Sequence, residues 1–138
     1  MPFAVAVLDK VGYAGVDETR ATRLFAAALS RRGVDLERVG EVSVALVDAE
    51  TIRDLNARFR SKDETTDVLS FEVDGLYGEI VGEVVVCPAC VSPEMGVEEL
   101  VVHGALHLSG MDHGEDFEGS EMARLQEAVM EELRGEEG

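Results

Sequence analysis

The sequence predicts a single α+β domain, in which a roughly four-stranded mixed sheet packs with about five helices. The length of 138 residues suits one hydrophobic core, and hydrophobic residues make up 46% of the chain, enough to fill it. Short apolar strands and amphipathic helices alternate in mixed order, which is typical of the α+β class. The sequence shows no repeat, linker or low-complexity block, so the domain is expected to span residues 1–138.

Four segments have the pattern of β-strands. Residues 3–8 are a short apolar run, and residues 42–46 alternate apolar and smaller or polar side chains. Residues 67–73, "DVLSFEV", form a third strand. Residues 82–87, "GEVVVC", form a fourth, and their continuous apolar run indicates a strand that is buried on both faces.

The first two helices are predicted from caps and apolar spacing. Asp17 can cap a helix that reaches about Arg32, and Gly33 ends it. The apolar stripe of this helix consists of Ala21, Leu24, Phe25, Ala28 and Leu29. Asp48 or Glu50 opens a shorter helix. Its inward residues are expected to be Ile52, Leu55 and Phe59.

Two further helices are predicted in the last third of the chain. Ser92 and Pro93 have the residue types of a helix start, and this helix is expected to run to about Ser109. It is apolar nearly all round from Leu100 onward, so it should be central and buried. The final helix is expected from about Glu118 to Arg134. Its inward residues are Met122, Leu125, Val129 and Leu133.

The charge and the cysteines limit the classes of protein that fit. Against 29 acidic residues stand 12 basic ones, a net charge of −17, which repels nucleic acid unless positive charge is concentrated locally. No signal peptide or membrane-length apolar run is present, so we expect a cytoplasmic protein without a membrane partner. Cys87 and Cys90 form a single CxxC, which we interpret as semi-buried structural thiols rather than a redox site.

All three histidines of the chain lie in the segment "HGALHLSGMDH". His103 and His107 are one turn apart, so their imidazoles share a helix face and can chelate one ion. Gly110 has the residue type that stops a helix in the left-handed conformation and could bring His113 to the same ion. This is the spacing of a zincin-like metal helix, and three ligands would leave a position for water. One zinc ion is favoured over nickel, copper or iron; the alternative is three ordinary histidines.

Gly104 stands where a zinc protease of this spacing carries its glutamate base. Glu99 lies one turn before His103 and is the nearest candidate for that role, or for orienting His103. It could equally be a solvated acid that interacts favourably with the helix N-terminus. Asp112 could accept a hydrogen bond from a metal-bound histidine or merely stabilise its own turn.

Four basic residues cluster within ten positions: Arg53, Arg58, Arg60 and Lys62. Arginine matches the geometry of phosphate with two parallel hydrogen bonds, so this local positive charge indicates an anion-binding site. The alternative is the solvent-exposed face of a short helix. Arg58, Arg60 and Lys62 are the candidate substrate-binding residues.

The motif "TDVLSF", preceded by "LN..FR.KD" and followed by "GEVVV" and the histidine segment, resembles the YbeY family of endoribonucleases and ribosomal RNA maturation factors. The resemblance implies a compact α+β fold with one zinc ion held by His103, His107 and His113. It implies that Arg60 is functionally important. It also implies metal-dependent cleavage of single-stranded RNA in 16S rRNA 3′-end maturation and in ribosome quality control, with the small ribosomal subunit and its proteins as partners.

The missing glutamate matters less for a phosphodiester substrate than for a peptide, because an alkoxide leaving group needs less general-acid catalysis than an amine. Zinc can activate the attacking oxygen, and Arg60 can stabilise charge on the nonbridging oxygens. Two alternatives stay open: a non-catalytic zinc-containing ribosome-assembly factor, which the acidity favours, and a metalloprotease, which Gly104 opposes.

Overall fold

The computed structural model describes residues 3–112, 117 and 119–137. Its regular elements are β1 (Ala6–Asp9), α1 (Glu18–Arg31), β2 (Val39–Leu46), α2 (Ala49–Arg60), β3 (Val68–Asp74), β4 (Ile80–Val86), α3 (Val97–Leu108) and α4 (Glu121–Glu137), with short 3-10 helices at Leu36–Arg38 and Pro88–Cys90. Within these residues the chain forms one α+β domain with a four-stranded mixed sheet and four α-helices, one fewer than the approximately five expected.

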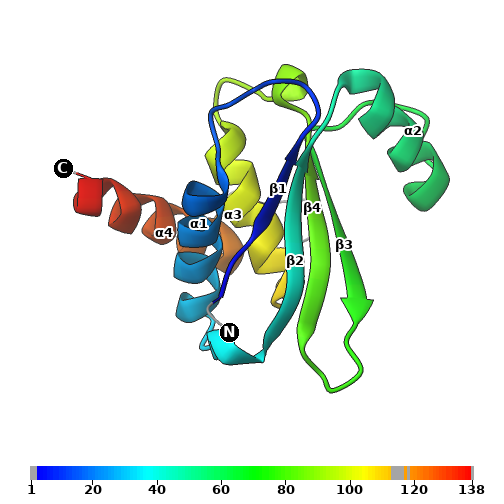
Figure 1. Cartoon of the computed structure of the whole chain (residues 1–138). Helices are drawn as coiled ribbons and strands as arrows, with labels where there is room; N and C mark the ends of the chain where they lie inside the picture. Colours follow the sequence, from blue (N-terminus) through cyan, green and yellow to red (C-terminus); the bar gives the residue numbers. More distant parts are fainter. Residues whose placement is uncertain (1–2, 113–116, 118, 138) are drawn as a thin grey trace.

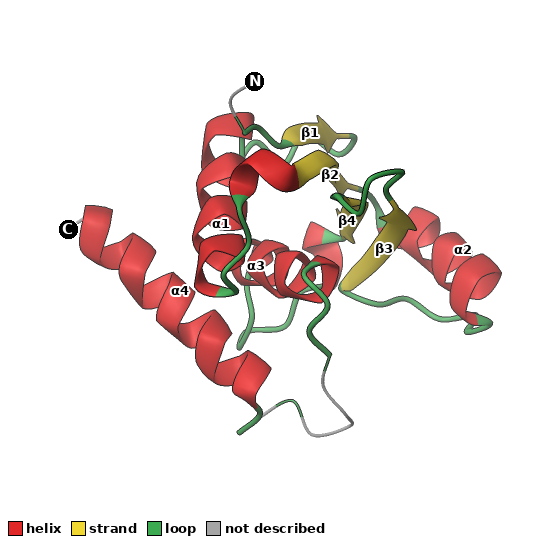
Figure 2. Cartoon of the chain, turned by 90° about the horizontal axis from the view of Figure 1, so that it is seen from below, coloured by secondary structure: helices red, strands yellow, loops and turns green. Residues whose placement is uncertain are grey.

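The sheet has the strand order β1-β2-β4-β3. Strands β1, β2 and β4 are parallel, and β3 returns antiparallel to β4 at the edge of the sheet (Figure 1). Helices α1 and α3 cover one face, and α4 packs outside them (Figure 2). Helix α2 lies on the other side of the sheet, beyond β3.

Alternation along the strands divides the hydrophobic core into two clusters. Val44 and Val84 point to the α1–α3 face and are fully buried in the larger cluster. Their neighbours Ala45 and Val85 point the other way, into a smaller cluster with Ile52 of α2. Because β4 contributes to both clusters, its apolar run predicted the buried strand correctly.

Several caps form as the sequence predicts. The Asp17 carboxylate accepts a hydrogen bond from the backbone N–H of Arg20 at 2.8 Å, and Gly33 takes a left-handed conformation after α1. The Asp48 carboxylate accepts one from the N–H of Thr51 at 2.8 Å. Hydrogen bonds from the Thr51 side chain and backbone hold the pKa of Asp48 below its usual value.

The starts of several elements differ from the prediction. Strand β2 begins at Val39 rather than at residue 42, and β4 begins at Ile80 rather than at residue 82. The first strand begins at Ala6 rather than at residue 3, because the N–H of Val5 donates to the Thr22 hydroxyl of α1 at 3.0 Å instead of to a neighbouring strand. The histidine helix begins at Val97, not at the Ser92–Pro93 pair, which lies in a turn closed by a bridge between Ser92 and Met95. For the last helix, the predicted start at Glu118 lies outside the described residues, and α4 is observed from Glu121.

The predicted inward position of Phe59 was also wrong, since its side chain is 65% exposed. Helix α2 buries Ile52 and Asn56 instead, so its buried face is turned away from Phe59. The ring of Phe59 contacts that of Phe71 edge to face, with 5.2 Å between centroids. Among the described residues, no helix is both long enough and apolar enough to cross a membrane.

Candidate functional site

Helix α3 presents two histidine side chains toward one point. His103 is 9% exposed, and the His107 side chain is 24% exposed. Their Nε2 atoms lie 3.2 Å apart. This distance is close to the separation of about 3.3–3.4 Å that two nitrogens take on a tetrahedral zinc ion with Zn–N bonds of about 2.0–2.1 Å.

The other ring nitrogens have oxygen partners that define the tautomers. Nδ1 of His103 lies 3.0 Å from Oε1 of Gln126 on α4, and Nδ1 of His107 lies 3.0 Å from the carbonyl of Met111. Both oxygens are acceptors, so a neutral ring at either position carries its proton on Nδ1 and presents a lone pair at Nε2. Two lone pairs directed at each other favour a shared cation. The donor set therefore fits a divalent metal that accepts imidazole ligands.

The third predicted ligand, His113, lies outside the described residues. Within the described chain, no group of three or more metal-ligating side chains occurs. Gly110 has a φ of +99° after the end of α3, and the N–H of Met111 bonds back to the carbonyl of Leu106 at 3.1 Å. The helix thus stops at the predicted glycine. Asp112 approaches Nδ1 of His107 only to 4.0 Å, so the Met111 carbonyl is the closer partner.

The structure gives a packing reason for the absence of a protease-type glutamate at Gly104. This glycine faces β4, and a Cβ atom placed there would overlap the side chain of Val84, with Cγ2 only 2.6 Å away. No side chain fits between α3 and the sheet at this position. A catalytic base cannot come from residue 104 in this fold.

Replacing Gly104 with alanine is expected to lower the free energy of unfolding by about 1–3 kcal/mol, the usual cost of overpacking a core. Alanine otherwise stabilises a helix by about 1 kcal/mol relative to glycine. The expected loss of unfolding free energy therefore comes from the clash with Val84 and not from helix propensity. Gly135→Ala in α4 is the matched control, because a Cβ atom added to Gly135 would have no neighbour within 4 Å. Urea denaturation should show a loss for Gly104→Ala and no loss for Gly135→Ala. Equal stability of the two variants would contradict this packing.

Arg60 is the last residue of α2 and is held by the turn that follows. Ser61 takes a left-handed conformation with a φ of 59°, and its N–H bonds back to the carbonyl of Asn56. The Asn56 side chain is buried and donates to the carbonyl of Glu64 at 2.9 Å. These bonds fix the direction in which the chain leaves the helix, and with it the position of Arg60.

Arg60 and His107 line the same cleft, which has a volume of about 430 Å³. The other lining residues are Ser70, Glu72, Gly110, Met111 and Asp112. Arg60 makes no ion pair with any described residue, whereas Arg53 pairs with Asp63 and Arg58 pairs with Asp54. The cleft therefore combines an available guanidinium with an imidazole of the histidine pair.

The remaining predicted site residues lie elsewhere. Arg58 and Lys62 are exposed but do not line the cleft. Glu99 is half-buried in the first turn of α3 and is not among the cleft residues. Their proposed roles in substrate binding and proton transfer stay predictions.

Sequence reasoning missed two residues that shape the site. Gln126, 4% exposed, holds His103, and Asn56, 3% exposed, anchors the turn after Arg60. Gln126 occupies an inward position of α4 between Met122 and Val129. A polar residue on an otherwise apolar helix face was the available signal.

The cysteine pair agrees with its interpretation as structural thiols. Cys87 is buried, Cys90 is half-buried, and their sulfur atoms lie 2.7 Å apart. Burial raises the pKa of Cys90 to about 11, so its thiol stays protonated at neutral pH and is a poor nucleophile.

The fold and the cleft define a single-domain α+β protein whose central helix carries a histidine pair opposite an arginine. The family model described as "Endoribonuclease YbeY" matches residues 9–134. The Endoribonuclease YbeY of Rubrobacter xylanophilus is 64% identical over 136 residues, covering 98% of this chain and 99% of that protein. This chain belongs to the YbeY family, as the sequence resemblance predicted.

More distant relatives support the same family assignment and the same fold. The Endoribonuclease YbeY of Thermotoga petrophila is 40% identical over 105 residues, which cover 69% of each chain. The solution structure of TM1509 from Thermotoga maritima is similar with a TM-score of 0.54 and 28% identity, over 96% of this chain and 90% of that one.

Proposed function

We propose that this protein is a zinc-dependent endoribonuclease that cleaves single-stranded RNA and acts in 16S rRNA 3′-end maturation and ribosome quality control. Family membership supports the RNA-cleaving activity. The observation that carries the proposal is the shared cleft of Arg60 and His107, which brings a phosphate-binding group to a candidate metal centre.

His103 and His107, together with His113, would hold the zinc ion. Gln126 and the Met111 carbonyl fix the tautomers of the first two, so that each Nε2 is ready to donate a lone pair. When bound, zinc acts as a Lewis acid toward the phosphate and the attacking oxygen.

Arg60 would bind the nonbridging oxygens of the scissile phosphate. A guanidinium donates two parallel hydrogen bonds and keeps its charge at any physiological pH. Because Arg60 has no ion pair among the described residues, it can turn toward a phosphate without first breaking one. It would stabilise the additional negative charge of the transition state.

The strongly acidic surface limits how RNA reaches the cleft. A net charge of −17 repels free RNA at long range, before the RNA reaches the cleft. We propose that the small ribosomal subunit and its proteins present the RNA in the cytoplasm, so that local contacts at Arg60 and its neighbours Arg58 and Lys62 suffice.

The substrate class is tested by incubating the purified protein with single-stranded RNA, duplex RNA and casein. Cleavage of single-stranded RNA alone is the expected result. Cleavage of casein would favour a metalloprotease. Zinc retained without cleavage of any substrate would favour the assembly-factor alternative, which the acidity of the chain supports.

Gln126→Leu is expected to weaken zinc binding about 10–100-fold, because Nδ1 of His103 loses the acceptor that orients the ring. Competition with a chromophoric chelator measures the affinity. Gln126→Glu keeps an acceptor oxygen at the same position and should bind zinc within a few-fold of the unsubstituted protein. Unchanged affinity in the leucine variant, with its fold intact by circular dichroism, would remove Gln126 from the site.

A further inference from the structure

Phe59 is a large apolar side chain that is exposed at the end of α2, beside the candidate active site. It is 65% exposed, although the apolar spacing of the helix predicts that it faces inward. The next residue, Arg60, lines the cleft that contains His107, whereas Phe59 is not one of the cleft residues. The proposed activity therefore assigns no role to an exposed aromatic ring that adjoins its phosphate-binding arginine.

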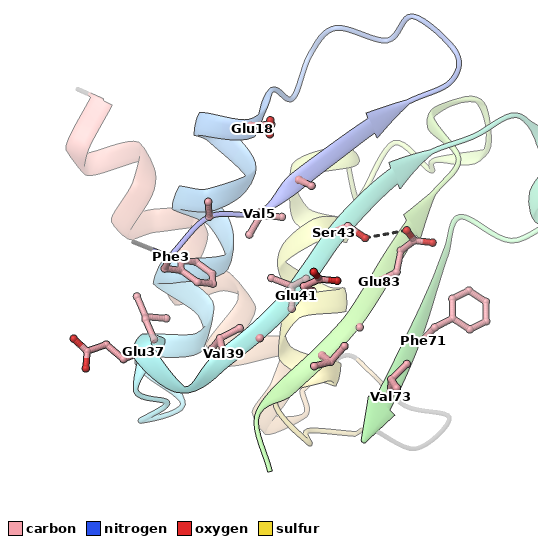
Figure 3. A pocket seen from close by; sticks show the side chains of 17 residues that line it. Phe3, Val5, Glu18, Glu37, Val39, Glu41, Ser43, Phe71, Val73 and Glu83 are labelled. Atoms are coloured by element: carbon pink, nitrogen blue, oxygen red, sulfur yellow. Dashed lines mark hydrogen bonds between the residues drawn. The ribbon is translucent and has the colours of Figure 1, made fainter. Parts of the chain in front are cut away.

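Phe71 of β3 supports the Phe59 ring. The two rings meet edge to face, with centroids 5.2 Å apart and 71° between their planes. Phe71 packs against the smaller core cluster, which includes Ile52 of α2. Figure 3, which looks onto the groove along β2 and β4, shows the Phe71 ring projecting from β3 on the side away from β4. In an edge-to-face pair, Phe71 leaves at least one face of the Phe59 ring uncovered.

Phe59 and Arg60 flank the edge strand β3 from its two sides. Ser70 and Glu72 line the cleft with Arg60, whereas Phe71 between them points to the opposite face and contacts Phe59. The Cα atoms of neighbouring residues are only about 3.8 Å apart. A nucleic acid strand bound at Arg60 can therefore reach Phe59 by bending round the edge of the sheet. A single strand can make this bend, but a duplex is too stiff.

We propose that the Phe59 ring stacks with a nucleobase next to the phosphate that Arg60 binds. Proteins that bind single strands combine positive charge for the backbone with aromatic side chains on which bases stack. Every base has a π-face, so this contact does not depend on sequence. Bases within a duplex already stack on one another, so the contact selects unpaired RNA. The inference rests on the proposed function, because Phe59 would recognise the same RNA substrate.

Stacking also suits the unfavourable charge of this chain. A net charge of −17 opposes binding through the phosphates alone, whereas an uncharged ring adds affinity that salt does not screen. The position of the ring favours a base over the apolar side chain of a protein partner. It adjoins the guanidinium of Arg60, which lines the cleft and makes no ion pair with any described residue.

Substitutions of Phe59 test the proposal in RNA-binding and cleavage assays. Phe59→Ala should raise the Kd for single-stranded RNA at least about tenfold, and the loss should appear in KM more than in kcat. Phe59→Tyr keeps an aromatic face and should bind like the unsubstituted protein. Phe59→Leu keeps apolar bulk without that face and should bind as weakly as the alanine variant. The ratio of Kd values should be the same at about 50 and 200 mM salt, because only charged contacts release counterions.

Tyr77→Ala is the matched control. Tyr77 is an aromatic residue with 86% exposure that does not line the cleft. Its substitution should change the Kd for single-stranded RNA no more than about twofold.

Tryptophan fluorescence detects the contact directly, because the chain contains no tryptophan. Phe59→Trp places a single indole at the proposed contact. Stopped-flow mixing with single-stranded RNA should quench its fluorescence before turnover, and duplex RNA should not. Tyr77→Trp should show no quenching with either RNA.

An RNA series that lacks one base at a time identifies the stacked nucleotide. At one position, loss of the base should weaken binding to the unsubstituted protein as much as Phe59→Ala does. The same loss should not weaken binding to the Phe59→Ala variant any further.

An unchanged Kd in a folded Phe59→Ala protein, full binding by Phe59→Leu, or equal effects of base loss at all positions would overturn the proposal. Unchanged RNA binding with weaker binding of purified small-subunit proteins would assign Phe59 to a protein interface and overturn it as well. Binding of RNA that depends on Phe59 but leads to no cleavage would refute the nuclease function and leave the stacking contact supported. Cleavage with binding that is independent of Phe59 would refute the stacking contact alone.

Discussion

Replacing His107 with alanine is expected to reduce RNA cleavage at least about 100-fold and to abolish stoichiometric zinc binding. The imidazole supplies one of two converging Nε2 lone pairs and also lines the cleft. A metal contributes several kcal/mol to such reactions, and each 1.36 kcal/mol is a factor of ten in rate. Single-turnover cleavage of a labelled single-stranded RNA, with zinc measured by mass spectrometry, gives both quantities.

The His107 side chain is partly exposed, so its removal should leave the fold intact, which circular dichroism and thermal unfolding can verify. Full cleavage activity in a folded, zinc-free His107→Ala protein would contradict the assignment of this histidine to the metal centre.

Replacing Arg60 with alanine is expected to reduce kcat about 10²–10³-fold while leaving the zinc content unchanged. The loss corresponds to removing one preorganised donor from the transition state. The guanidinium lines the cleft with His107 but contacts neither histidine in the described structure, so metal binding should not depend on it. Arg60→Lys keeps the charge but not the two-pronged geometry, and its activity should fall between those of alanine and arginine.

Arg58→Ala provides the matched control for Arg60. It lies on the same helix, pairs with Asp54 at 3.1 Å and does not line the cleft. The Arg58→Ala substitution should weaken RNA binding slightly and leave kcat within a few-fold of the value for the unsubstituted protein. Comparable kcat losses in the two variants would show that the helix contributes only general positive charge.

The sequence predicted those parts of the fold that depend on local patterns. Four strands occur where four were expected, although the starts of β1, β2 and β4 are shifted by two or three residues. The cap residues Asp17 and Asp48 and the stop glycine Gly110 act as expected. The errors arose where tertiary contacts outweigh local signals. Ser92 and Pro93 resemble a helix start, yet a bridge to Met95 holds them in a turn.

The candidate site was predictable in its residues but not in its arrangement. Helical spacing alone places His103 beside His107. Nothing in the sequence places Arg60, 47 positions before His107, in the same cleft, because that depends on the order of β3 and β4 and on the turn fixed by Asn56. The support of His103 by Gln126 depends likewise on the packing of α4 against α3.

Close packing against β4 explains why residue 104 is a glycine. The sequence indicated only that a protease base is missing. The structure shows α3 packed so closely on Val84 that no side chain fits there. A proton acceptor for the proposed reaction would have to come from another residue. Glu72 and Asp112 bring carboxylates to the cleft, whereas Glu99 does not line it.

Metal removal and restoration on the unsubstituted protein tests the central claim most directly. Dialysis against a strong chelator should abolish cleavage of single-stranded RNA, and one equivalent of zinc should restore it while circular dichroism shows the fold unchanged. Undiminished cleavage by protein shown to be free of metal would contradict the account, because the paired histidines would then have no part in the reaction.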